Sequence, residues 1–270
     1  MTQEQWQLTG SGPDNYERYQ VPSVFEPLAR MFVGRISLRE GQRLLDVACG
    51  TGILARQAAP ILGPTGSIVG VDLNSRMLDV AREHAPCGGA PVEWRQGDAA
   101  SLPCPDADFD IVLCQQGLQF FPDKLHALRE MYRVLKPGGI LGICVWRAIE
   151  HSPCHLAISD ALRRHVSAAI AQRFEAPFKF GDPEVLHQAM VSAGLRDIDI
   201  QVGTIMRRLL PPKESIPGLL ASTPVGPDIA ALEEATRDAI VDDVTIALSE
   251  YRNENGLTVP QPTYIALATK

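Results

Sequence analysis

Residues 44–72, LLDVACGTGILARQAAPILGPTGSIVGVD, decide the fold of this chain. A short apolar run ends in Asp46, a glycine-containing turn and a segment with helical spacing follow, and a second apolar run ends in Asp72. This order predicts strand, tight turn, helix and strand, which is one βαβ unit of a nucleotide-binding α/β fold. The spacing of 20 residues from Gly52 to Asp72 puts a carboxylate where it can accept hydrogen bonds from ribose hydroxyls.

The glycine turn indicates which kind of nucleotide is bound. A dinucleotide-binding loop reads G-x-G-x-x-G, whereas this loop reads ACGTG and has Ala55 at the third glycine position. Asp46 stands at the mouth of the first strand, where its negative charge would repel a pyrophosphate and attract an ammonium or sulfonium group. We therefore expect a nucleoside ligand that carries positive charge and no phosphate.

Further apolar runs predict the rest of a sheet. Short runs bounded by Gly, Pro or Asp predict strands over 44–47, 67–71, 92–96, 109–114 and 140–146. Helical spacing between them predicts helices over 53–62, 75–84 and 124–135, the last ended by a glycine cap in Lys-Pro-Gly-Gly at 136–139. Beyond them, 182–192 reads as a helix capped by Asp182, and 198–206 and 262–269 read as strands.

Four ordered motifs give the chain a family resemblance. LLDVACGTG (44–52), GVDLNSRML (70–78), RQGDAASLPCPDADFDIVLC (95–114) and LREMYRVLKPGG (128–139) resemble the class I S-adenosylmethionine-dependent methyltransferases, in the small-molecule branch of the ubiquinone and menaquinone biosynthesis type (methyltransferase type 11). The resemblance covers about residues 40–147. Ala48 replaces the first glycine of the usual loop, and because alanine lacks only the freedom to adopt positive φ, the loop survives if Ala48 occupies an ordinary backbone region.

The resemblance implies an α/β fold with a Rossmann-like, doubly wound, seven-stranded sheet. Its last strand is antiparallel, and helical lid insertions cover the cofactor site. On this template the chain divides into an N-terminal helical lid segment (1–40), the S-adenosylmethionine-binding core (41–150), a lid insertion (151–180), a core helix and sixth strand (181–210), a second lid insertion (211–260) and the final core strand (261–270). The lid rises on the side of the carboxyl ends of the strands, where open α/β sheets bind ligands.

Residue roles at the cofactor follow from the chemistry and the resemblance together. The backbone around Ala48, Gly50 and Gly52 is expected to lie against the methionine half, with Asp46 bonded to its ammonium directly or through water. The other expected contacts are Asp72 to both ribose hydroxyls, Leu73 and Met77 to the two faces of the adenine, Asp98 and the amide of Ala99 to the adenine edge, Gln115 to the methionine part, and Tyr16 to its carboxylate.

Four of these residues have an alternative structural interpretation. Asp72 is also placed to cap the following helix, and Met77 has the spacing of an ordinary core residue. Asp98 follows Gly97 as a turn-former would, and Tyr16 has an alternative role in packing.

Methyl transfer from a sulfonium mainly requires that the acceptor be held in line and that water be excluded. For a phenol, catechol or carbon acid a base is also useful, and His151 and His155, just beyond the fifth strand, are the candidates, although a helical histidine often has only a surface or packing role. His126 begins a helix that covers the sheet and is a less favoured base, and Gln119 and Asp123 are further pocket candidates. Apolar lid residues are expected either to surround a small apolar or aromatic acceptor or to form the lid's own core: Phe174, Phe178, Phe180, Leu209, Leu210, Leu219 and Leu220.

Composition excludes several other classes of partner. A net charge of -7 without a long basic run argues against a nucleic acid, and the pairs 163–164 and 207–208 of arginines read as solvated charge. The six cysteines lack metal-ligand spacing, so we expect no metal and small buried thiols. No signal segment or membrane span is recognised. We expect a cytoplasmic enzyme of class EC 2.1.1, a monomer or homodimer, that converts S-adenosyl-L-methionine to S-adenosyl-L-homocysteine.

Two rival functions stay open. A Rossmann oxidoreductase that uses NAD would need a loop compatible with pyrophosphate, against which Asp46, Ala55 and the segment Gly97-Asp98-Ala99 argue. A non-catalytic S-adenosylmethionine-binding or scaffold protein would carry the same binding motifs. A turnover assay separates these possibilities from methyl transfer.

Overall fold

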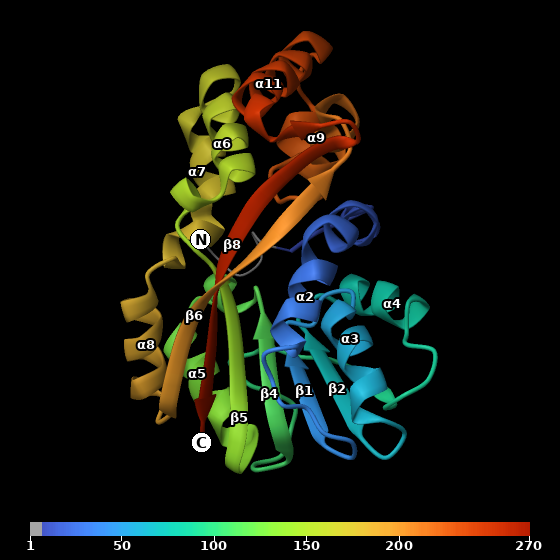
Figure 1. Ribbon diagram of the computed structural model, residues 1–270, viewed down its shortest axis with the longest axis vertical. Coiled ribbons are helices and arrows are strands. Elements are labelled where there is room, and N and C mark those ends of the chain that lie inside the picture. The colour runs from blue at the N-terminus through green and yellow to red at the C-terminus, as the bar shows by residue number, and fades with distance from the viewer. Residues whose placement is uncertain (1–6) are drawn as a thin grey trace.

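The computed structural model describes residues 7–270, which form one mixed sheet with the order β3-β2-β1-β4-β5-β8-β6 and helices around it (Figure 1). The strands are β1 (Arg43–Val47), β2 (Ser67–Asp72), β3 (Val92–Gln96), β4 (Phe109–Gln115), β5 (Leu135–Trp146), β6 (Arg196–Leu209), β7 (Arg252–Asn253) and β8 (Gly256–Thr269). The first five are parallel, and β8 runs antiparallel to both β5 and β6. The Rossmann-like sheet is confirmed, and the two-residue β7, which pairs with β8, adds an eighth strand to the expected seven.

Helices cover both faces of the sheet. One apolar cluster joins α2 and α3 to one face, and a second joins α5 and α8 to the other. The helices are α1 (Gly12–Asn15), the π-helical η2 (Tyr16–Phe25), α2 (Glu26–Val33), α3 (Ile53–Leu62), α4 (Ser75–Glu83), α5 (Lys124–Val134), α6 (Pro153–His165), α7 (Ala168–Glu175), α8 (Pro183–Ser192), α9 (Pro212–Ala221), α10 (Gly226–Ala230) and α11 (Glu234–Ala247), with single 3-10 turns η3 (Leu118–Phe120), η4 (Ile149–His151), η5 (Ala176–Phe180) and η6 (Ser249–Tyr251).

Local capping sets where several core helices begin and end. The side chains of Asn74, Asp123 and Asp182 each accept a backbone N–H two or three residues on, at 2.8–3.0 Å, and so start α4, α5 and α8. The expected glycine cap of α5 is wrong. The helix ends at Val134, and Leu135 is already extended because it pairs with Phe109 as the first residue of β5.

A long two-stranded ribbon carries the lid. The pairing of β6 with β8 runs from Arg196 opposite Thr269 to Leu209 opposite Leu257, and the upper part of this ribbon leads to α6, α7, α9 and α11 (Figure 1). These helices and the ribbon end share an apolar cluster of their own. Residues 256–260, expected in the second lid insertion, are therefore strand.

The two faces of β6 have opposite environments. Its alternation was recognised, but the residues that marked it, Val202 and Met206, are 46% and 51% exposed. The covered face carries Ile205, Arg207 and Leu209 in its lid half. The interpretation of the 207–208 pair as solvated charge is thus wrong for Arg207, which is only 1% exposed.

The N-terminal segment joins the core to the lid. Of the expected unit 1–40, residues 1–6 lie outside the described residues. The side chains of η2 and α2 pack into the cluster over α3, and η2 also contacts α9 of the lid.

No helix within residues 7–270 has the length and apolar content needed to cross a lipid bilayer. Five of the six cysteines are buried as expected, and Cys87 is exposed.

Candidate active site

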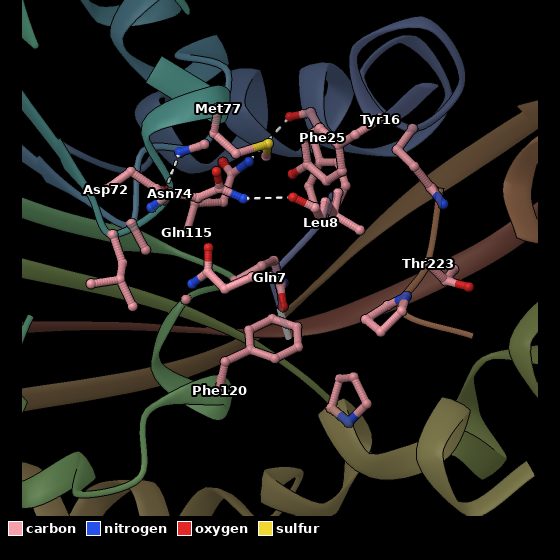
Figure 2. A pocket seen from close by; sticks show the side chains of 18 of the residues that line it. Gln7, Leu8, Tyr16, Phe25, Asp72, Asn74, Met77, Gln115, Phe120 and Thr223 are labelled. Atoms are coloured by element: carbon pink, nitrogen blue, oxygen red, sulfur yellow. Dashed lines mark hydrogen bonds between the residues drawn. The ribbon is translucent and has the colours of Figure 1, made fainter. Parts of the chain in front are cut away.

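A cavity of about 280 Å³ lies beyond the carboxyl ends of β1, β2 and β4. The N-terminal segment, the sheet edge and the lid all contribute side chains to it (Figure 2). Of the predicted site residues, those that line it are Tyr16, Ala48, Gly50, Asp72, Leu73, Met77, Ala99, Gln115 and His155. Those that do not are Asp46, Gly52, Asp98 and His151.

In the loop after β1, every second residue from 48 to 52 has a backbone conformation in the left-handed region. Ala48, Gly50 and Gly52 have φ values of +56°, +56° and +84°. Ala48 therefore does not meet the condition of an ordinary backbone region, and its conformation costs an L-residue about 1–2 kcal/mol. Its methyl group packs so closely on Gly117 that a Cβ at that position would lie 2.6 Å away. Close packing therefore holds the loop in this strained form.

Gly52 faces the sheet and not the cavity. A Cβ built on Gly52 would lie 2.4 Å from Cη2 of Trp94 on β3, and one on Gly70 would lie 2.5 Å from the same indole. The amide of Gly52 donates to the carbonyl of Cys49 at 2.9 Å, within the loop. The glycine is thus required by the indole that it covers.

Asp72 ends β2 at the floor of the cavity. Its Oδ2 accepts the amide of Gly50 at 2.8 Å and its Oδ1 accepts the amide of Asn74 at 2.9 Å, and Figure 2 shows the carboxylate beside Asn74 and Met77. Each carboxylate oxygen retains a second lone pair for a ligand hydroxyl. Burial raises the pKa of Asp72, and the amides of Asn74, Gly50 and Leu73 partly offset this rise.

Asp46 lies beneath the loop and is 1% exposed. Its Oδ2 has no hydrogen-bond partner among residues 7–270. Burial, and next the charge of Asp72, raise the pKa of Asp46 well above its ordinary value. Two carboxyls under one loop therefore form a site whose electrostatic strain a cation relieves.

Tyr16 and Gln115 both contact Phe25. The Tyr16 ring stacks on Phe25 at a centroid separation of 4.8 Å, and the amide Nε2 of Gln115 donates to the carbonyl of Phe25 at 3.3 Å. Oε1 of Gln115 is buried and has no partner among the described residues. An acceptor atom left in this way on the cavity wall suits a positively charged donor such as an ammonium group.

The predicted adenine edge is only partly at the cavity. Gly97 and Ala99 line it. Oδ1 of Asp98 accepts the amide of Ala100 at 2.9 Å, which is the turn-forming geometry of the alternative interpretation. The assigned contact of Asp98 to the adenine amino group stays a prediction.

The two candidate histidines have different environments. His151 is exposed and lies 3.1 Å from a guanidinium nitrogen of Arg147 through its Nε2. His155 lies on the cavity wall among aromatic rings, with centroid separations of 4.8 Å to Phe178, 5.9 Å to Phe174 and 6.2 Å to Trp146. Burial, with a smaller effect of the Arg207 charge, lowers the pKa of His155 to about 3.

The other lid predictions divide between cavity and core. Phe174 and Phe178 line the cavity, Leu210 is exposed, and Phe180 packs against the core cluster of α5 and α8. Leu209, Leu219 and Leu220 belong to the lid's own apolar cluster. Gln119 is buried and donates to Gln116 at 2.9 Å, whereas Asp123 caps α5.

Several cavity residues escaped the sequence analysis. Trp146 ends β5, so its position at the carboxyl end of a strand was a usable signal. Gln20, Phe25, Ser222 and Thr223 have no motif around them and reach the cavity only through tertiary packing. Within residues 7–270 no cluster of three or more His, Cys, Asp or Glu side chains is arranged for a metal ion.

The strand order, the glycine loop and the acid at the tip of β2 define a class I Rossmann-like nucleoside-binding fold. Residues 45–143 match the family described as "Methyltransferase domain". This part of the chain is therefore similar in sequence to a methyltransferase domain, and its strand order is that of the class I fold.

Two relatives have similar sequences over part of their length. The chain is 48% identical over 106 residues to the ubiquinone/menaquinone biosynthesis C-methyltransferase of Ectopseudomonas mendocina. The aligned residues make up 38% of this chain and 41% of that protein. It is 37% identical over 143 residues to the demethylmenaquinone methyltransferase of Listeria welshimeri, 53% of this chain and 60% of that protein. The chain spans about half the length of the curated relatives that it matches.

A solved structure extends the similarity of fold to the lid. Phosphoethanolamine N-methyltransferase 2 of Haemonchus contortus, in complex with S-adenosyl-L-methionine, superposes with a TM-score of 0.55 at 21% identity. The match covers 97% of this chain and 60% of that protein. At this identity the match establishes the fold alone.

Proposed function

We propose that this protein transfers a methyl group from S-adenosyl-L-methionine to a small, apolar or aromatic acceptor. The observation that carries the proposal is one cavity with two unlike ends. At one end Asp72 is held by two loop amides over a second buried acid, and at the other His155 stands among aromatic lid residues. The first end suits a cationic nucleoside, and the second suits a planar acceptor.

The residues present fit S-adenosylmethionine. The free Oε1 of Gln115 suits its ammonium group, the second lone pairs of Asp72 suit its ribose hydroxyls, and Leu73 and Met77 suit the adenine faces. When bound, it would supply an activated methyl group: a lone pair of the acceptor would attack the methyl carbon in line, and the sulfur would leave as a neutral thioether with the carbon–sulfur electron pair. Asp46 and Asp72 favour the cationic form of the ligand through their charge.

Lid residues hold the acceptor and exclude water. Trp146, Phe174 and Phe178 supply apolar surface at the transfer end, which favours a dry site. His155 is neutral at pH 7, so its Nδ1, which has no partner among the described residues, can accept a hydrogen bond from an acceptor hydroxyl in one tautomer or donate one to an acceptor oxygen in the other. Because the pKa of about 3 makes the ring a weak base, we assign His155 to orientation of the acceptor and not to general base catalysis.

The nature of the acceptor is supported less directly. Two relatives are named for ubiquinone, menaquinone or demethylmenaquinone methylation, which supports a quinone-like aromatic acceptor. The lid residues that face the acceptor end lie outside residues 45–143. We further propose that the protein is a cytoplasmic monomer or homodimer. We also propose that it has no nucleic-acid partner, which the net charge of -7 supports.

A binding and turnover experiment tests the proposal. Calorimetric titration with S-adenosylmethionine is expected to give one site per chain. Incubation with hydroquinones, catechols and phenols is then expected to form S-adenosylhomocysteine together with a product heavier by one methylene. Tight binding with no S-adenosylhomocysteine formed from any acceptor would favour the non-catalytic alternative. Uptake of NAD in place of S-adenosylmethionine would overturn the proposal.

The two buried acids predict how cofactor affinity depends on pH. Their pKa values are raised above the ordinary value of about 3.9. A raised pKa retains a proton to higher pH, and a cation favours the deprotonated form, so binding of S-adenosylmethionine should release protons. We expect its affinity to fall as the pH is lowered from neutral toward the raised pKa values of these two acids. Calorimetry in two buffers of different ionisation enthalpy measures the release.

The matched variant for this prediction is Asp46→Asn, which removes the acid whose pKa burial and Asp72 raise together. Its affinity for S-adenosylmethionine is expected to vary less with pH than that of the wild type. A wild-type affinity that stays constant over this range would contradict the prediction.

A further inference from the structure

Arg207 is a buried cation in the lid half of β6, and it does not line the cavity itself. It lies on the covered face of β6 and is 1% exposed. Its Nη2 donates to Oε1 of Gln20 at 3.0 Å, and its Nε has no partner among residues 7–270. It forms no ion pair with any described acidic side chain. Burial of an unpaired guanidinium is unfavourable, so this charge needs a counter-ion.

The groups that adjoin Arg207 form the cavity wall. Gln20, which accepts its hydrogen bond, lines the cavity, and Nε2 of Gln20 donates to Oγ of Ser222, a further lining residue, at 2.7 Å. His155 lines the same end, and its buried Nδ1 has no partner among the described residues. Gln20 therefore connects the buried cation to the cavity wall.

A second arginine near this end of the cavity, Arg173, already has a counter-ion. Arg173 also lines the cavity, but it is paired with Asp228 at 3.0 Å and donates to the carbonyl of Pro224. Its charge is already compensated by the protein. The unbalanced positive charge at this end is therefore that of Arg207.

We propose that the acceptor is anionic, a phenolate, enolate or aromatic carboxylate whose negative charge lies at the end of the cavity bounded by Gln20, His155 and Ser222. This inference rests on the proposed methyl transfer and narrows its substrate class. Arg207 acts as a specificity-determining residue through Gln20 and through its field. A phenolate or enolate arrives without its proton and attacks the methyl carbon with the lone pair of the anion, so for these acceptors no base is needed on the enzyme.

The test compares two probes of equal shape, 4-hydroxybenzoate and its neutral analogue 4-hydroxybenzamide. Each is titrated calorimetrically, at low ionic strength and neutral pH, into protein saturated with S-adenosylhomocysteine. The wild type is expected to bind the carboxylate at least about tenfold more tightly than the amide. Equal affinity for the two probes, or binding of neither, would overturn the inference.

Neighbouring arginines supply the matched variants. Arg207→Met is expected to reduce the preference for the carboxylate to less than about twofold, whereas Arg208→Met, on the exposed face of the same strand, is expected to keep it. Gln20→Glu places a carboxylate on the atom that Arg207 contacts and is expected to abolish the preference even if Arg207→Met does not fold. Retention of the preference in Gln20→Glu, or equal behaviour of the two arginine variants, would contradict the role of Arg207.

The first titration in each experiment keeps the two proposals separate. Failure of the wild type to bind S-adenosylhomocysteine would refute the proposed function. Normal binding of S-adenosylhomocysteine without a preference for the anionic probe would refute only the inference about the acceptor.

Discussion

Asp72→Ala is expected to weaken the binding of S-adenosylmethionine by at least about 100-fold, because the two charge-assisted hydrogen bonds that we propose between Asp72 and the ribose would be lost at once. The carboxylate also holds the loop, through the amides of Gly50 and Asn74, so the loop loses its support on the ligand side. The fold itself should persist, since β2 remains paired on both sides by β1 and β3. Calorimetric titration measures the affinity, and circular dichroism checks the fold.

Two further variants control for this effect. Asp79→Ala removes an exposed acid of α4 that pairs with Arg76 and Arg82, and its affinity is expected to stay within about twofold of the wild type. Asp72→Asn keeps the shape but turns an NH₂ group toward one of the two backbone donors, so it is expected to bind poorly as well. Wild-type affinity in Asp72→Ala would remove this residue from the cofactor site.

Gly52→Ala is expected to destabilise the protein by about 2–5 kcal/mol, which combines the left-handed backbone of an L-residue with overpacking against an indole. The new Cβ would lie 2.4 Å from Trp94, whose ring cannot withdraw because Gly70 confines it from β2. The melting temperature should fall by roughly 5–15 °C. Urea-induced unfolding measures the change in the free energy of unfolding.

Gly138→Ala separates the two contributions. Gly138 has a φ of +77°, close to the +84° of Gly52, but nothing lies within 4 Å of a Cβ built on it. Its cost is expected to be that of the backbone alone, about 1–2 kcal/mol. In a Trp94→Leu background the cost of Gly52→Ala should fall to the same range. Equal costs for Gly52→Ala and Gly138→Ala in the wild-type background would show that Trp94 is not the obstacle.

The cofactor half of the fold was predictable from local signals. Buried parallel strands are short apolar runs, and the βαβ unit places Asp72 at a strand tip whatever the rest of the chain does. The structure accordingly brings Gly50, Asp72, Met77 and Gln115 to one cavity, as predicted. Their roles toward the cofactor remain predictions until ligand binding is measured.

The acceptor half could not be predicted in the same way. Alternation along β6 indicates a strand, but it does not tell which face a lid of distant helices will cover, and Arg207 on the buried face was interpreted as solvated. Gly52 was assigned to the ligand because the loop pattern contains it, whereas its need for a glycine comes from Trp94, 42 residues further along the chain. Contacts between segments that are far apart in the sequence produce no periodic pattern in the sequence of either segment.

Because the β6–β8 ribbon is continuous from core to lid, its length is tied to parity. Successive side chains of a strand point to opposite faces. The gain of one residue in each strand below the lid would therefore turn Arg207 to solvent and bring its solvent-facing neighbour to the covered face. Only gains or losses in steps of two would raise or lower the lid with the same side chains turned inward. Chamber depth in this architecture can therefore change without a change of chamber chemistry only in increments of about 7 Å.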